Sequence, residues 1–129
     1  MFVGDFKASK TICSDEVYQK IYSYFNQFQQ PLIYTLGDNE WTDCHQYGDV
    51  TFNPEERLEY LRKSFFNDSL SLRIQKMKFT SESTQPGFKK NIEDKHCNFN
   101  AISCSTIHIV GSNNNFHSES ENVNKEFYD

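Results

Sequence analysis

Two short loops, residues 4–7 and 37–40, carry the side chains of this sequence that are best suited to chemistry. The first loop reads Gly-Asp-Phe-Lys and the second reads Gly-Asp-Asn-Glu, and each follows a short apolar run. Asp5 and Asp38 supply carboxylates, the ligands that hard divalent cations prefer. A Gly-Asp turn is also an ordinary turn, so a metal site requires that the fold bring both loops together.

The second loop opens the densest polar segment of the chain, residues 37–45. Three acids, an amide, the only Trp and a histidine fall within these nine residues. This density exceeds what a turn requires and indicates a functional site. The alternative interpretation is a solvated turn whose Trp41 folds back onto the core.

The elements that position these loops follow from the apolar pattern. Residues 2–3 read as the end of a buried strand, and residues 32–36 read as a second strand that Gly37 ends. Between them, Ser14 is a good N-cap for a helix over residues 15–28, where apolar side chains repeat at helical spacing. Strand, helix and strand predict a parallel βαβ unit, in which ligands gather at the carboxyl ends of the strands. We therefore expect Asp5 and Asp38 on one rim.

The remainder of the chain predicts one more helix and one more strand. Asn53 followed by Pro54 begins a helix that ends near residue 66, and its inward face is Leu58, Leu61 and Phe65. Residues 67–90 have a weak pattern, typical of a strand or an irregular flap. Residues 101–110 predict a third strand that ends in a polar loop. The predicted fold class is α/β, with three strands and two helices.

Length and composition limit the function further. The 129 residues provide for one domain, and the net charge of -5 argues against binding a nucleic-acid duplex. No apolar run approaches the roughly 20 residues that span a membrane, and the N-terminal residues lack the pattern of a secretory signal.

The four cysteines lack the paired spacings of a structural zinc site. Cys13 and Cys44 each lie a few residues beyond one of the two acidic loops. If those loops converge, the two sulfur atoms approach each other and a disulfide is one outcome. Free thiols are the other outcome, because the compartment decides between them.

Four segments, taken in order, carry a resemblance to a known family. They are residues 3–9 with Cys13, residues 31–45, residues 53–66 and residues 107–114. Together they resemble one branch of the calcineurin-like metallophosphoesterases, and the segment around Trp41 is the most specific of the four. The resemblance implies a partial metallophosphoesterase-like domain over residues 1–117, a sandwich of mixed sheets flanked by helices, with a polar tail over residues 118–129.

The resemblance also implies a function, the metal-dependent hydrolysis of a phosphate ester by metal-activated water. Members of the family hold two divalent metal ions, expected here to be manganese, iron or zinc. Asp5 stands at the position of the carboxylate that bridges the two metals. Asp38 replaces the amide ligand of the family's Gly-Asn-His-Glu/Asp turn, and Asn39 stands where that turn has its catalytic imidazole.

This last difference changes the expected chemistry, because an amide does not protonate a leaving alkoxide as a histidine does. Asn39 is expected to hydrogen-bond a phosphate oxygen instead. His45 is a candidate for the missing imidazole, oriented by Glu40 or Asp43, and the alternative is a histidine on a surface loop. The predicted catalytic residues are therefore Asn39, Glu40 and His45.

The family's first Asp-x-His motif is expected before Phe2, and its later Gly-His-x-His motif after the third strand. Both are missing, so the chain is expected to be truncated at both ends. One interpretation is the N-proximal portion of a phosphoesterase. A second is an inactive remnant or interaction module that self-associates through an unpaired strand edge. A third is a small α/β domain whose acidic loops bind one calcium ion.

Overall fold

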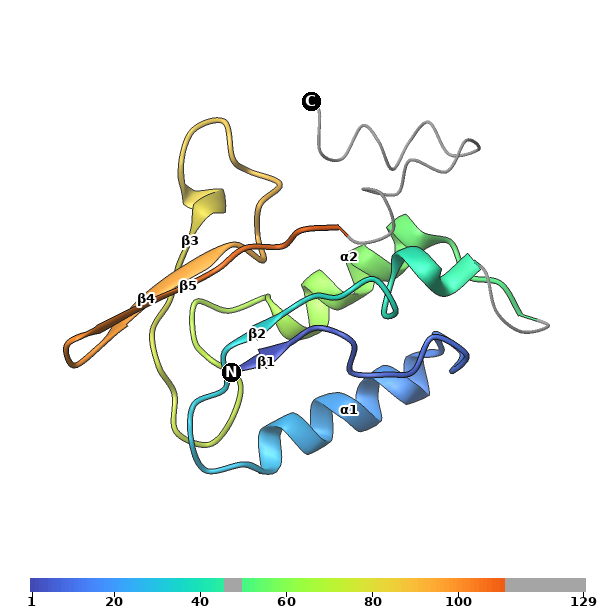
Figure 1. The fold of residues 1–129 in the computed structure, drawn as a ribbon, viewed down its shortest axis with the longest axis horizontal. Coiled ribbons are helices and arrows are strands. Elements are labelled where there is room, and N and C mark those ends of the chain that lie inside the picture. Colours follow the sequence, from blue (N-terminus) through green and yellow to red (C-terminus); the bar gives the residue numbers. More distant parts are fainter. Residues whose placement is uncertain (46–49, 111–129) are drawn as a thin grey trace.

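Figure 1 shows the computed structural model, in which residues 1–45 and 50–110 are described. These residues form two α-helices and five strands, and the strands make two separate sheets. The predicted α/β class is therefore confirmed at this level, with five strands instead of the three expected. The predicted loop at residues 111–115, the end of the predicted domain at residue 117 and the tail over residues 118–129 lie outside the described residues.

The first sheet is the predicted βαβ unit. Strand β1 (Phe2–Val3) and strand β2 (Tyr34–Thr35) are parallel, with Phe2 opposite Tyr34 and Val3 opposite Thr35. The ladder continues into the loop, because the Gly4 amide donates to the Thr35 carbonyl at 2.9 Å. The loops that follow these two strands therefore lie at the same edge of the sheet.

The two predicted helices are confirmed, and both begin at the predicted caps. Helix α1 is Asp15–Gln27, and the Ser14 hydroxyl accepts a hydrogen bond from the Val17 amide at 3.5 Å. Helix α2 is Pro54–Phe65, and Asn53 accepts from the Glu56 amide at 3.1 Å. Each cap satisfies a backbone donor that the first helical turn leaves without a partner.

Aromatic rings from both helices and both strands form the core. Phe25 of α1 lies 5.4 Å from Tyr34 of β2, and Tyr34 lies 5.7 Å from Phe65 of α2, measured between ring centroids. The predicted inward face of α2 is also buried, with Leu58 and Leu61 at most 2% exposed. Large rings thus compensate for the low apolar content of the sequence.

The second sheet differs from the prediction. Strands β3 (Thr80–Ser81), β4 (Lys95–Phe99) and β5 (Ile102–Thr106) are antiparallel in the order β3-β4-β5. The predicted strand over residues 101–110 is thus shorter, and it pairs with β4 in an antiparallel hairpin whose other strand the sequence did not indicate. In Figure 1 this hairpin projects away from the body formed by α1, α2, β1 and β2.

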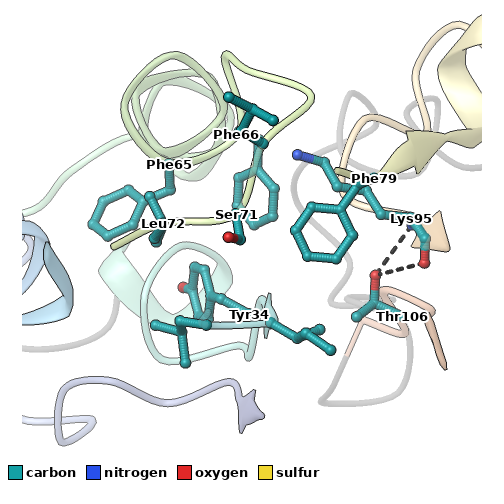
Figure 2. A pocket seen from close by; sticks show the side chains of 11 residues that line it. Tyr34, Phe65, Phe66, Ser71, Leu72, Phe79, Lys95 and Thr106 are labelled. Carbon is teal, nitrogen blue, oxygen red and sulfur yellow. Dashed lines mark hydrogen bonds between the residues drawn. The ribbon is translucent and has the colours of Figure 1, made fainter. Parts of the chain in front are cut away.

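A small apolar space separates the base of this hairpin from the βαβ unit, as Figure 2 shows. Lys95 points into it, and its ammonium group donates to the Asp68 carbonyl at 3.2 Å and lies 5.1 Å from the centroid of Phe66. Burial lowers the pKa of Lys95, and the charges of Glu93 and Asp68 oppose that shift. The Thr106 hydroxyl accepts from the Lys95 amide at 3.1 Å and fixes the start of the hairpin.

Within the part of the chain that the structure describes, neither helix combines the length and apolar character required to cross a membrane.

Candidate functional site

The candidate site lies where the loops after β1 and β2 meet, and we call residues 4–7 and 37–40 the rim loops. Their backbones touch at two glycines. A Cβ atom on Gly4, whose φ is +60°, would lie 2.6 Å from the Gly37 Cα, and a Cβ atom on Gly37 would lie 2.2 Å from Asp5 Oδ1. Only glycine allows this approach at both positions. The predicted convergence of the two loops is therefore confirmed.

This contact brings Asp5 and Asp38 together at the edge of the sheet. Asp5 has a φ of 55°, and its Oδ1 atom accepts from the Asn39 amide at 3.4 Å. Partial burial raises the pKa of Asp5, and the charge of Asp38 and a hydrogen bond with it act in the same direction. The Asn39 amide and the charge of Lys7 oppose them. The charge of Asp38 thus adds to the cost of ionising Asp5, and a cation bound between them would lower that cost.

The Glu40 side chain connects the two rim loops on the side that faces the core. It is fully buried, and its carboxylate accepts hydrogen bonds from the Gly37 amide at 2.7 Å, the Tyr34 hydroxyl at 2.9 Å and the Asp5 amide at 3.0 Å. Burial raises the pKa of Glu40 to about 7, although the bonds from Gly37 and Tyr34 lower it. These contacts give Glu40 a structural role, and its catalytic role stays a prediction.

Asn39 is tied to the opposite rim loop, because its side-chain amide donates to the Lys7 carbonyl at 3.3 Å. His45 lies at the end of the short 3₁₀ helix Thr42–His45, where its Nδ1 atom is 2.6 Å from the Thr42 carbonyl. Since a carbonyl only accepts, this contact assigns the proton to Nδ1. The imidazole is exposed. Burial and the charge of Asp38 raise the pKa of Asp43, and the charges of His45 and Lys7 oppose that increase. Asp43, one of the two carboxylates expected to orient His45, is thus its electrostatic neighbour.

Lys7 is a charged residue of the site that the sequence reasoning missed. It is only 6% exposed, and its ammonium group donates to the Thr11 carbonyl at 2.8 Å. Burial lowers the pKa of Lys7, whereas the charges of Glu40, Asp43 and Asp5 raise it. The only indication in the sequence that Lys7 belongs to the site was its position two residues after Asp5. The chain therefore supplies its own cation to the carboxylates of the rim.

A disulfide between Cys13 and Cys44 holds the segments that follow the rim loops. Their Cα atoms are 5.7 Å apart, and the bridge spans 31 positions of the sequence. Of the two outcomes that the sequence left open, a disulfide or free thiols, the structure contains the disulfide. The Tyr18 hydroxyl adds a second tie, since it donates to the Glu40 carbonyl at 2.6 Å.

Arg57 anchors the start of α2 to the same region. Its guanidinium donates to the Cys13 carbonyl at 2.9 Å and to Asp15 at 2.6 Å, and it lies 5.5 Å from the ring centroid of Tyr18. Hydrogen bonds with Glu56 and Asp15 raise its pKa against the effect of burial. Both helices are therefore fixed relative to the disulfide.

The residues present meet the demands of a two-metal site only in part. Asp5 and Asp38 are carboxylates of the right type, and they lie together. However, across residues 1–45 and 50–110 no three His, Cys, Asp or Glu side chains converge as they would have to around a metal ion. The other described histidines lie elsewhere, His96 on the exposed face of β4 and His108 buried against the ring of Trp41. The described residues thus do not complete a two-metal site.

Comparisons of the chain with protein-family models, with curated proteins and with solved structures found no match. The resemblance to the calcineurin-like metallophosphoesterases therefore stays a prediction.

Proposed function

We propose that this chain contributes the Gly-Asp rim of a phosphate-ester hydrolase of the calcineurin-like metallophosphoesterase type. The observation that carries this proposal is the meeting of Asp5 and Asp38 at the carboxyl ends of two parallel strands. Binding sites of α/β sheets gather at this position, because the loops that follow the strands converge there. In this proposal the strands and helices belong to a partial sandwich of mixed sheets.

The roles of the site residues follow from their positions. Asp5 and Asp38 would bind a divalent ion, manganese, iron or zinc, and the reaction would be hydrolysis by metal-activated water. Asn39, held by the Lys7 carbonyl, would donate to a phosphate oxygen. His45, with its proton assigned to Nδ1, would use the Nε2 atom for proton transfer. Glu40 would keep the two loops in register.

Manganese binding tests the proposal most directly. Affinity depends on the number and rigidity of the ligands, so two carboxylates should bind Mn²⁺ weakly and measurably. A titration of the chain with Mn²⁺, followed by the electron paramagnetic resonance signal of the free ion, should show saturable binding that the double variant Asp5→Asn/Asp38→Asn loses.

A matched control removes the same charge elsewhere. Glu16 and Glu59 are exposed acids on the two helices, so Glu16→Gln/Glu59→Gln should leave the Mn²⁺ isotherm unchanged. Equal binding by wild type and the Asp5→Asn/Asp38→Asn variant would reject the rim as a metal site. If Mn²⁺ binds at the rim, hydrolysis of an aryl phosphate should be lost in the same variant.

A specific observation favours a second candidate function, that of an interaction module. The tip of the β4–β5 hairpin exposes Phe99 at 56% and Ile102 at 61%, on a segment that projects from the body of the molecule (Figure 1). Apolar side chains on a projecting strand pair are typical of surfaces that associate. In this second proposal the chain is an inactive remnant that pairs through this hairpin.

A further inference from the structure

Two cysteines that the rim does not use lie opposite each other in the second sheet. Cys97 belongs to β4 and Cys104 to β5, and the antiparallel register makes them direct partners. Both are free thiols in this structure. The flanking pairs of the ladder are Asn98 with Ser103 and His96 with Ser105.

The geometry of the ladder suits a covalent bond between these sulfur atoms. Directly opposed residues of antiparallel strands have Cα atoms about 4.5–5.5 Å apart and side chains on the same face. A disulfide requires Cα atoms roughly 4.4–6.8 Å apart, with side chains that point toward each other. Cys97 and Cys104 therefore meet this requirement without any change of strand register.

Contacts on both sides of the cysteine pair fix that register. Toward the core, the Thr106 hydroxyl accepts from the Lys95 amide at 3.1 Å. Toward the tip, the Ser103 hydroxyl donates to the Asn98 side chain at 2.6 Å. The strands are thus held together one or two residues from each sulfur atom, and neither thiol can slide away from the other.

The two thiols differ in access to solvent. Cys97 is 4% exposed, whereas Cys104 is half-buried. Burial raises the pKa of the Cys97 thiol, and the nearby Cys104 adds to that increase. Because the thiolate is the nucleophile, a reaction with a dissolved oxidant begins at the more accessible Cys104.

We propose that Cys97 and Cys104 form an oxidisable thiol pair that closes to a cross-strand disulfide on reaction with a small disulfide such as oxidised glutathione. The Cys104 thiolate attacks one sulfur of oxidised glutathione, forms a mixed disulfide and releases one glutathione thiolate. Cys97 then gives up its proton and attacks the Cys104 sulfur, which forms the protein disulfide and releases the second glutathione. The two cysteines lose two electrons and two protons, and one oxidised glutathione becomes two reduced ones.

The experiment counts thiols in the native, full chain. The protein is incubated with oxidised glutathione, then denatured and alkylated with N-ethylmaleimide without reduction, and its mass is measured. We expect two alkylated thiols before the incubation and none after it. A peptide map should contain Cys97 and Cys104 joined within one chain.

Two variants separate the steps. Cys97→Ser should stop at the mixed disulfide and retain one glutathione, whereas Cys13→Ser/Cys44→Ser should still close the Cys97–Cys104 bridge.

Persistence of two thiols in the incubated wild type would overturn the proposal, as would a glutathione that stays attached to wild-type Cys104. Disulfide-linked dimers instead of an intrachain bridge would overturn it too. The wild-type measurement needs no substitution, so it decides the matter even if a variant fails to fold.

Discussion

Glu40 connects more parts of the rim than any other side chain described above, since one buried carboxylate accepts from β2, from the loop after β1 and from the loop after β2. An ionised carboxylate in such a place is costly unless hydrogen bonds compensate its lost hydration. Here the compensation is incomplete, and the pKa of Glu40 rises to about 7. The rim therefore contains a group that changes charge near neutral pH.

The raised pKa of Glu40 makes stability depend on pH. Between about pH 4.5 and pH 7 the folded state retains a proton that the unfolded state has lost, so the free energy of unfolding falls as the pH rises. The Glu40 contribution should decrease by up to about 3 kcal/mol across this window and stay constant above it. Urea unfolding of wild type and Glu40→Gln at pH 5, 6, 7 and 8 measures it as the difference between the two proteins. A difference that does not change with pH would contradict the assignment.

Gly37 sets the distance between the rim loops. Its replacement by alanine places a Cβ atom 2.2 Å from Asp5 Oδ1 and 2.6 Å from the Asp5 amide, so the loops must separate. We expect Gly37→Ala to destabilise the fold by roughly 2 kcal/mol and to weaken any Mn²⁺ binding. Gly87→Ala is the control, because a Cβ atom there meets nothing within 4 Å and only its φ of +90° is unfavourable. Thermal unfolding of both variants should rank Gly37→Ala as the more damaging, and the opposite order would refute the role of Gly37.

Among the elements, one unit consists of β1, α1, β2 and α2, and the order of these strands and helices could be predicted from the sequence. Apolar periodicity located both helices, and Ser14 and Asn53 marked their starts, because these signals depend on local chemistry. The convergence of the rim loops followed from parallel pairing, whereas the sequence left Cys13 and Cys44 open between a disulfide and free thiols. The helices could be predicted because their signals rest on residues close together in the sequence, and the parallel pair could be predicted because a helix connects two apolar runs.

The second sheet could not be predicted in the same way. Strand β4 begins with Lys95, whose burial depends on a carbonyl group and an aromatic ring supplied by residues 68 and 66. Strand β3 is two residues long and polar. The burial of Lys7 was missed for a different reason: cations are usually exposed, and the path of the backbone that places the Thr11 carbonyl next to its ammonium group has no sequence signal. Contacts distant in sequence decide the position of the second sheet, whereas Lys7 donates to the nearby Thr11 carbonyl.

The Cys13–Cys44 disulfide should stabilise the fold because it restricts the unfolded chain. It closes a loop of about 30 residues that contains all of α1 and β2. In the chain-entropy treatment such a loop restricts the unfolded state by about 3–4 kcal/mol. Cys13→Ser/Cys44→Ser should therefore lower the free energy of unfolding by this order in urea titrations. Cys97→Ser/Cys104→Ser, which removes two free thiols, should change it much less, and equal losses would contradict the constraint.

At the scale of the whole molecule, a body that contains the rim supports a hairpin that extends away from it (Figure 1). The body encloses a cluster of buried rings, whereas the hairpin leaves Phe99 and Ile102 exposed. The net charge of -5 opposes the approach of two copies, whereas the exposed apolar tip would favour it.

The hairpin tip should therefore govern the oligomeric state. If the chain is an interaction module, light scattering after size-exclusion chromatography should give a mass above that of one chain, increasing with protein concentration. Phe99→Ser/Ile102→Thr should restore the monomer because it removes the exposed apolar surface. Val50→Ser, at another exposed apolar residue, is the control and should not. A monomer at every concentration in the wild type would argue against self-association.

The disulfide between Cys13 and Cys44 also determines how this protein should be produced. Dithiothreitol in a purification buffer would open that bridge, and a binding or activity assay would then report on loosened loops. The same holds for expression in a bacterial cytosol, where thiols are kept reduced. Secretion into the periplasm, or refolding under oxidising conditions followed by work without reductant, keeps the Cys13–Cys44 bridge closed.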